Sequence, residues 1–175
     1  MERTLLFFFS FFIEAIILWQ YTSILFIPKY SGKIRALFLS ILYFILFFFS
    51  QFHNIFLNTL LFLCANVFFF LVNFMLPFSS ALLHSFVITG IMSVSELATM
   101  GLIIKFFPGF FSIDTMGMLF FCIFSKSSFF VIVHALTHIL KHKQYLQESH
   151  NSSELFLMLI PISSIFVMLT FVTIA

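Results

Sequence analysis

Three ionisable residues, Glu14, Glu96 and Lys126, lie inside long apolar segments of the sequence. A charged side chain at the centre of a membrane helix costs about 2.5–3.5 kcal/mol on insertion scales, so each of the three needs a partner or a function. Counting about 1.5 Å per helical residue places all three in the outer half of a bilayer about 30 Å thick. We therefore expect Lys126 to form an ion pair with Glu96, with Glu14 as the alternative acid.

Two other roles stay open for these charges. Lys126 could extend its long side chain to the outer interface, while Glu96 is protonated or hydrogen-bonded to Ser93 or Ser95. A ligand-binding or proton-binding role is the third reading. Glu14, Glu96 and Lys126 are therefore candidate binding or signal-coupling residues.

Asn58, Asn66 and Asn73 share one apolar segment. Buried Asn amides hydrogen-bond between membrane helices, and each such bond contributes about 1 kcal/mol or less. We expect this structural role, with the lining of a polar cavity as the alternative. Asn66 and Asn73 are accordingly added to the candidate binding residues.

His134, His138 and His142 recur at every fourth position, which places them on one face of a helix. The HxxxH spacing is typical of zinc ligands. The pattern lacks the Glu of HExxH, however, and His or Lys at a cytoplasmic helix end is favoured by the helix dipole and the lipid headgroups. We expect no metal and no cofactor, and these histidines are the ligand set to test for a metal.

The composition decides which elements must position these residues. The chain has 175 residues, 62% of them hydrophobic, with only eight basic and six acidic residues, whereas a soluble domain carries about a quarter charged residues. A membrane crossing needs about 20 helical residues, so the apolar runs predict about six spans. We expect an all-α bundle, a single transmembrane domain over residues 1–175. The expected spans are about 4–27, 36–52, 56–76, 81–104, 115–140 and 155–175.

This organisation excludes several function classes. It leaves no stretch of about 100 polar residues for a soluble catalytic domain. A net charge of +2 is too small to indicate a protein that binds nucleic acid. The lipid bilayer is therefore the first expected partner.

Basic residues in the short loops predict the orientation, because cytoplasmic loops carry an excess of Lys and Arg. The larger group follows the first and fifth spans: Lys29, Lys33, Arg35, Lys141 and Lys143. The opposite set of loops and ends holds only Arg3 and Lys105. We expect a multi-pass cell-membrane protein with its N-terminus outside. Because the last span stops without a basic anchor, we expect a fragment or a naturally short protein.

Several short motifs follow one another along the chain in an order that resembles that of a known family. They are a basic first loop (PKYSGK, 28–33), an Asn-bearing third span, MSVSEL at 92–97, Ser125-Lys126, the basic His142-Lys143 end, and LIPIS at 159–163. This order resembles the membrane-embedded sensor region of GHKL-type histidine kinases of Gram-positive bacteria. That class includes the accessory-gene-regulator peptide receptor.

The resemblance implies a sensor in two-component, quorum-sensing signalling. Such a bundle detects an extracellular signal, often a peptide, and passes it to a cytoplasmic kinase, as a homodimer or through a separate chain. Glu96 and Lys126 match the family's Ser-Glu and Ser-Lys pairs, which implies a structural or signal-coupling role. The phosphoacceptor His region and the ATP-binding domain are missing from these 175 residues, so we expect no enzymatic activity.

Two alternatives stay open. A six-helix chain of this length also fits the substrate-binding subunit of an energy-coupling-factor transporter for a vitamin-type molecule, although Ala15 is the one small residue between bulky ones in its first span. A peptide-processing membrane protease is disfavoured because the sequence has no GxSxG, paired aspartates or HExxH. His53 and Cys64 are the nearest His and Cys, and a turn is expected after His53.

Overall fold

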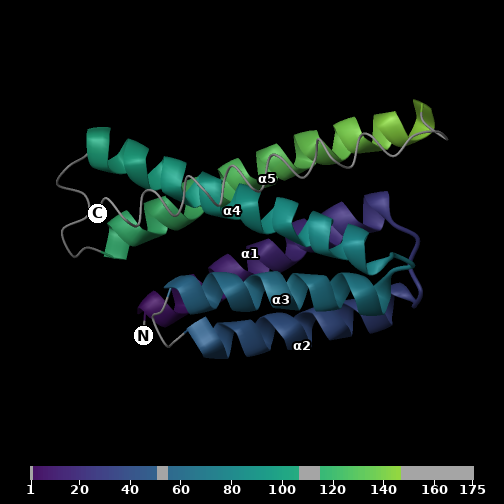
Figure 1. Cartoon of the computed structure of the whole chain (residues 1–175). Helices are drawn as coiled ribbons and strands as arrows, with labels where there is room; N and C mark the ends of the chain where they lie inside the picture. Colours follow the sequence, from purple (N-terminus) through teal and green to yellow (C-terminus); the bar gives the residue numbers. More distant parts are fainter. Residues whose placement is uncertain (1, 51–54, 107–114, 147–175) are drawn as a thin grey trace.

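The computed structural model describes residues 2–50, 55–106 and 115–146, which form five helices. In chain order they are α1 (Glu2–Leu25), α2 (Gly32–Ser50), α3 (Ile55–Asn73), α4 (Phe78–Phe106) and α5 (Thr115–Leu146), as Figure 1 shows. Within these ranges the only strand-like pairing is an isolated bridge between Pro28 and Phe74. The predicted all-helical class is confirmed for this part of the chain.

Four of the described helices are long and apolar enough to cross a membrane. The qualifying segments are Leu6–Leu25, Gly32–Ser50, Phe78–Phe106 and Gly117–Lys141, and α3 holds a shorter apolar segment, Leu57–Asn73. These segments are consistent with a multi-pass membrane protein. The expected sixth span, 155–175, lies outside the described residues.

The helix ends differ from the predicted ones, most of all in α5, which reaches Leu146 instead of 140. Two of the differences change how the loops are built. We expected a span over 36–52, but α2 begins at Gly32, and the amide of Arg35 donates to the carbonyl of Ser31 at 3.1 Å. Arg35 therefore lies in the first helical turn and not in the preceding loop. We expected the third span to reach residue 76, but α3 ends at Asn73, because Phe74 leaves the helix to pair with Pro28.

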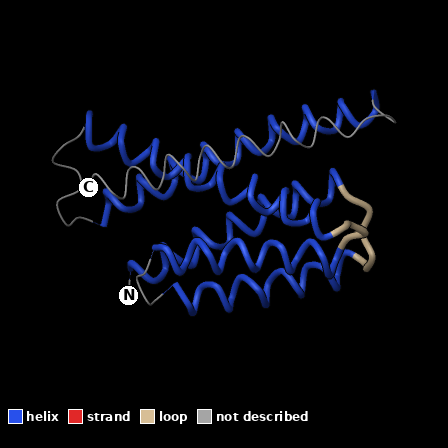
Figure 2. The backbone as a smooth tube through the Cα atoms, in the orientation of Figure 1, coloured by secondary structure: helices blue, strands red, loops and turns tan. Residues whose placement is uncertain are grey.

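The two described loops are fixed to each other at one end of the bundle (Figure 2). The Lys29 amide donates to the Asn73 carbonyl at 2.8 Å, and the Met75 amide donates to the Ile27 carbonyl at 3.3 Å. Lys29 Nζ also donates to the Leu71 carbonyl at 2.8 Å. An ammonium group stabilises the free carbonyls at a helix C-terminus, so Lys29 holds the end of α3.

The five helices pack as a closed ring. Each helix packs against its neighbours in sequence, and α5 closes the ring by packing against α1. Fully buried aromatic side chains fill the interior, among them Tyr21, Phe69, Phe70 and Phe74. Many large apolar side chains face outwards, such as Phe12 and Phe48. Lipid tails are as apolar as these side chains, so a bilayer accepts this outer surface.

Candidate functional site

Lys126 on α5 contacts two carboxylates from two other helices. Its Nζ lies 2.5 Å from Glu96 Oε1 on α4 and also donates to Glu14 Oε1 on α1. The Lys126 and Glu14 side chains are 4% and 6% exposed, whereas that of Glu96 is 37% exposed. We call these three residues the charge triad.

The charge triad agrees with the pairing expected from the sequence and extends it. The predicted Lys126–Glu96 pair is present, and Glu14, expected as the alternative acid, binds the same ammonium at the same time. Lys126 does not extend to the interface, because its side chain is buried. Ser95 does not bond Glu96 either, since its hydroxyl donates to the Met92 carbonyl at 2.7 Å.

The charge triad contains two acidic groups and only one basic group. One ammonium faces two carboxylates in surroundings of low polarity, so removal of Lys126 leaves two uncompensated acids. Removal of either acid leaves a neutral pair. Breaking a buried pair by removing one partner is costly because the remaining charge is uncompensated. Lys126 is therefore the member on which the arrangement depends most.

Asn66 and Asn73 on α3 do not form the expected bonds between helices in the described part of the chain. Asn73 Nδ2 donates to the Phe69 carbonyl of its own helix at 3.0 Å. Asn66 is fully buried, and neither of its amide atoms has a partner in the described part of the chain. Asn73 is also buried, and its Oδ1 atom has no partner in the described part of the chain. The interhelical expectation is therefore wrong for Asn73, and α3 contributes nothing to the charge triad.

The histidines named as a weak candidate ligand set do not come together as a metal site in the described residues. His134 is exposed, stacks on Phe130, and lies with Nδ1 3.3 Å from Gln20 Nε2. His138 is also exposed, and the side chain of His142 lies outside the described part. No three His, Cys, Asp or Glu residues come together there to hold a metal.

A partly buried contact between Tyr21 on α1 and His84 on α4 has no counterpart in the sequence predictions. Tyr21 Oη lies 2.7 Å from His84 Nδ1, and both rings pack against Phe26 and Phe70. The sequence offered one sign of this contact, namely that the polar rings of Tyr21 and His84 each lie in an apolar span. Nothing in the spacing indicated that these two rings meet.

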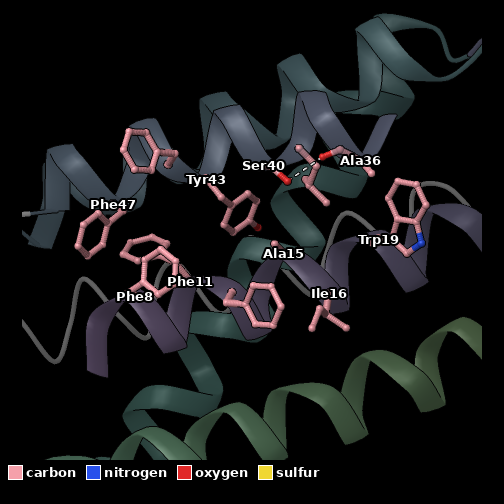
Figure 3. Close-up of a pocket in the computed structure, with 12 residues that line it drawn as sticks. Phe8, Phe11, Ala15, Ile16, Trp19, Ala36, Ser40, Tyr43 and Phe47 are labelled. Atoms are coloured by element: carbon pink, nitrogen blue, oxygen red, sulfur yellow. Dashed lines mark hydrogen bonds between the residues drawn. The ribbon is translucent and has the colours of Figure 1, made fainter. Parts of the chain in front are cut away.

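A second unpredicted feature is the groove between α1 and α2 in Figure 3. It has a volume of about 440 Å³, and its walls are mostly apolar side chains such as Phe8, Phe11 and Tyr43. Trp19 lines one end of it. The Arg35 guanidinium lies over the Trp19 ring, with its carbon 4.8 Å from the ring centroid.

Comparison with known proteins gives no family for this chain. No protein-family model matches it, and neither the curated proteins nor the solved structures give a match. Functional inference therefore depends on the geometry of the charge triad and the groove. The protease alternative gains nothing from that geometry, because Cys64 is exposed on α3 and His53 lies outside the described residues.

Proposed function

We propose that this chain is the membrane sensor module of a GHKL-type histidine kinase system. In this proposal it detects an extracellular peptide and passes the signal to a kinase domain that is not within these 175 residues. The observation that carries the proposal is the charge triad, which joins α1, α4 and α5 through one ammonium group. The motif order in the sequence supports the same family.

The triad supplies an element that a ligand can bias between two arrangements. Glu96 is the member that an incoming group can reach, because its side chain is 37% exposed while that of Lys126 is 4% exposed. A cationic group on a peptide competes with Lys126 for the Glu96 carboxylate. The Lys126–Glu14 pair then remains, so the ionic link between α4 and α5 is lost while the link between α1 and α5 is kept. A ligand shifts such an equilibrium only by its difference in affinity for the two states.

The proposed orientation places the N-terminus and the charge triad towards the outside. This follows from the basic residues Lys29, Lys33 and Arg35, which we assign to the cytoplasmic side under the positive-inside rule. The partner kinase would then receive the signal on that side, from a homodimer or through a separate chain.

Ligand retention by the purified full chain in lipid nanodiscs tests this function. The protein is incubated with peptide fractions from conditioned culture medium of the bacterium that carries the gene, and in parallel with a panel of vitamins. We expect retained peptide, detected by mass spectrometry. Glu96→Gln should lower retention about tenfold or more, since charge-assisted bonds are the strong ones. Lys105→Gln removes an exposed charge from the same helix and should leave retention unchanged.

The alternative function gives a different result in the same experiment. Retention of a vitamin without any peptide would reject the sensor proposal and support the substrate-binding subunit of a transporter. Equal peptide retention by Glu96→Gln and the unsubstituted chain would show that the charge triad does not take part in peptide recognition.

A further inference from the structure

The groove between α1 and α2 has the dimensions of one lipid tail. From Phe8 to Trp19 it follows α1 over twelve residues, whose eleven steps of 1.5 Å span about 16 Å. This length matches one leaflet of a hydrocarbon core about 30 Å thick. Its volume of about 440 Å³ is within the usual range for small-ligand pockets, about 300–1,000 Å³. Its apolar walls suit a hydrocarbon chain and offer little to a polar ligand.

A buried cation without a carboxylate partner lies at one end of the groove. Arg35 is 9% exposed, and its Nε and Nη1 atoms have no hydrogen-bond partner in the described part of the chain. Glu14 and Glu96 are the acidic residues whose side chains are described there, and both contact Lys126. The guanidinium lies over the Trp19 and Phe74 rings, at 4.8 and 5.4 Å from their centroids, and rings do not accept its N–H groups as an anion does. The guanidinium therefore has free donors for an anion.

The position of Arg35 selects the kind of anion. Arg35 is in the first turn of α2, about 5 Å along the helix axis from Gly32, where the candidate membrane span begins. A long side chain so close to the end of a span reaches the lipid headgroups. Arg35, Leu39 and Tyr43 follow one another at four-residue spacing, and the last two line the groove. Trp19 forms both the end wall of the groove and the ring under the guanidinium. A molecule that fills the groove thus brings its head to Arg35.

We propose that this groove binds one anionic phospholipid, with an acyl chain along α1 and α2 and the phosphate on Arg35. Guanidinium donors form a planar fork that matches phosphate oxygens. The two forks of a guanidinium are Nε with Nη2 and Nη1 with Nη2, so each unpartnered Arg35 donor belongs to one of them, and rotation of the flexible side chain presents a fork to the phosphate. The exposed Lys33 nearby adds positive charge, which favours an anionic over a zwitterionic headgroup. Free phosphate would leave the apolar groove empty.

The test uses the full chain in nanodiscs made from phosphatidylcholine and phosphatidylglycerol. Lipid retained after transfer to detergent is counted by native mass spectrometry, and a phosphatidylglycerol with a photoreactive acyl chain maps the site. We expect one retained phosphatidylglycerol per chain, cross-linked to α1 and α2. Arg35→Gln should lower its retention about tenfold, as expected for loss of a charge-assisted bond. Lys105→Gln is the control, because it removes an exposed charge in the last turn of α4, a helix that does not line the groove, and it should leave retention unchanged.

A second variant keeps the test valid if Arg35→Gln does not fold. Ala15→Phe places a ring in the groove and leaves Arg35 in place. It should lower retention and move the cross-links away from α1 and α2, with unchanged helix content by circular dichroism. Equal retention of both lipids, cross-links spread over all helices, or a second copy of the chain cross-linked across an empty groove would each overturn the proposal.

Discussion

Tyr21 on α1 and His84 on α4 are joined by a hydrogen bond of 2.7 Å, although 63 residues separate them in the sequence. In the ring of helices, α1 packs mainly against α2 and α5. The Tyr21–His84 bond therefore connects two helices that are not principal neighbours. It lies in a group of rings near the end where the loops pair, so it strengthens that end of the bundle.

Tyr21→Phe should destabilise the protein modestly. It removes the hydroxyl and leaves the ring, and hydrogen bonds between membrane helices contribute about 0.6–1.7 kcal/mol. Unfolding in mixed detergent and SDS micelles measures the change. Tyr30→Phe is the matched control, because Tyr30 is exposed in the loop after α1. Equal stability of Tyr21→Phe and the unsubstituted protein would contradict the contact.

The charge triad should respond unequally to neutralisation. Lys126→Gln leaves two buried acids uncompensated, and we expect a loss of about 3–5 kcal/mol, the range for breaking a buried ion pair. Glu96→Gln and Glu14→Gln each leave one neutral pair and should cost much less. The same unfolding assay compares the three variants. A Glu14→Gln variant less stable than Lys126→Gln would refute this order.

A disulfide should form readily between the two paired loops. The antiparallel bridge of Pro28 and Phe74 places their Cα atoms about 4.5–5.5 Å apart, a spacing that a disulfide can span. Pro28→Cys with Phe74→Cys, in a background with Cys64 and Cys122 replaced by Ala, should oxidise and shift on a non-reducing gel. Pro28→Cys with Lys105→Cys is the control, since Lys105 is in the last turn of α4. Oxidation of both pairs alike would count against the loop arrangement.

Cysteine labelling should place the start of α2 and the end of α4 on opposite sides of the membrane. Lys33→Cys and Lys105→Cys are both exposed positions. We expect a membrane-impermeant maleimide to label Lys105→Cys in intact cells and Lys33→Cys only after permeabilisation, in agreement with the positive-inside rule. The background again carries Ala at Cys64 and Cys122. The reverse pattern would invert the proposed orientation.

Asn66→Leu should leave stability unchanged or raise it. Asn66 is fully buried with both amide atoms unpartnered in the described part of the chain, and replacing unsatisfied polar atoms with an apolar group of similar shape is nearly neutral or stabilising. Asn73→Leu breaks the bond to Phe69 and should cost about 1 kcal/mol. A marked loss of stability in Asn66→Leu would show that its amide has a partner in the membrane.

The sequence was sufficient for the helices and for the ionic contact between them. Bilayer thickness sets the length of a span, so the apolar runs predicted the positions of α1 to α5 closely. Counting residues against the bilayer thickness also placed Glu14, Glu96 and Lys126 at similar depths. Charges at one depth in an apolar medium are expected to pair. The simultaneous contact of both acids with Lys126 was not predicted, because depth alone does not say which helices are neighbours.

The groove and its cation could not be predicted in this way. Arg35 contributed to the prediction only as a basic loop residue, and its burial over Trp19 depends on α2 starting at Gly32. Neighbouring helices are equally hard to assign, since apolar side chains occur on all sides of these helices and no polar face marks the outside. The Tyr21–His84 and Pro28–Phe74 contacts could not be predicted for the same reason, because each joins segments whose proximity the sequence does not indicate.

The closure of the ring by α1 and α5 has a consequence for biosynthesis. Glu14 and Lys126 are 112 residues apart, and at about 5–20 residues per second the ribosome needs roughly 6 to 22 seconds between them. During that interval the first inserted segment carries an acid without its base. During early assembly Glu14 therefore has to be protonated or kept out of the lipid by the insertion machinery. The charge on Glu14 is compensated only when the fifth segment inserts.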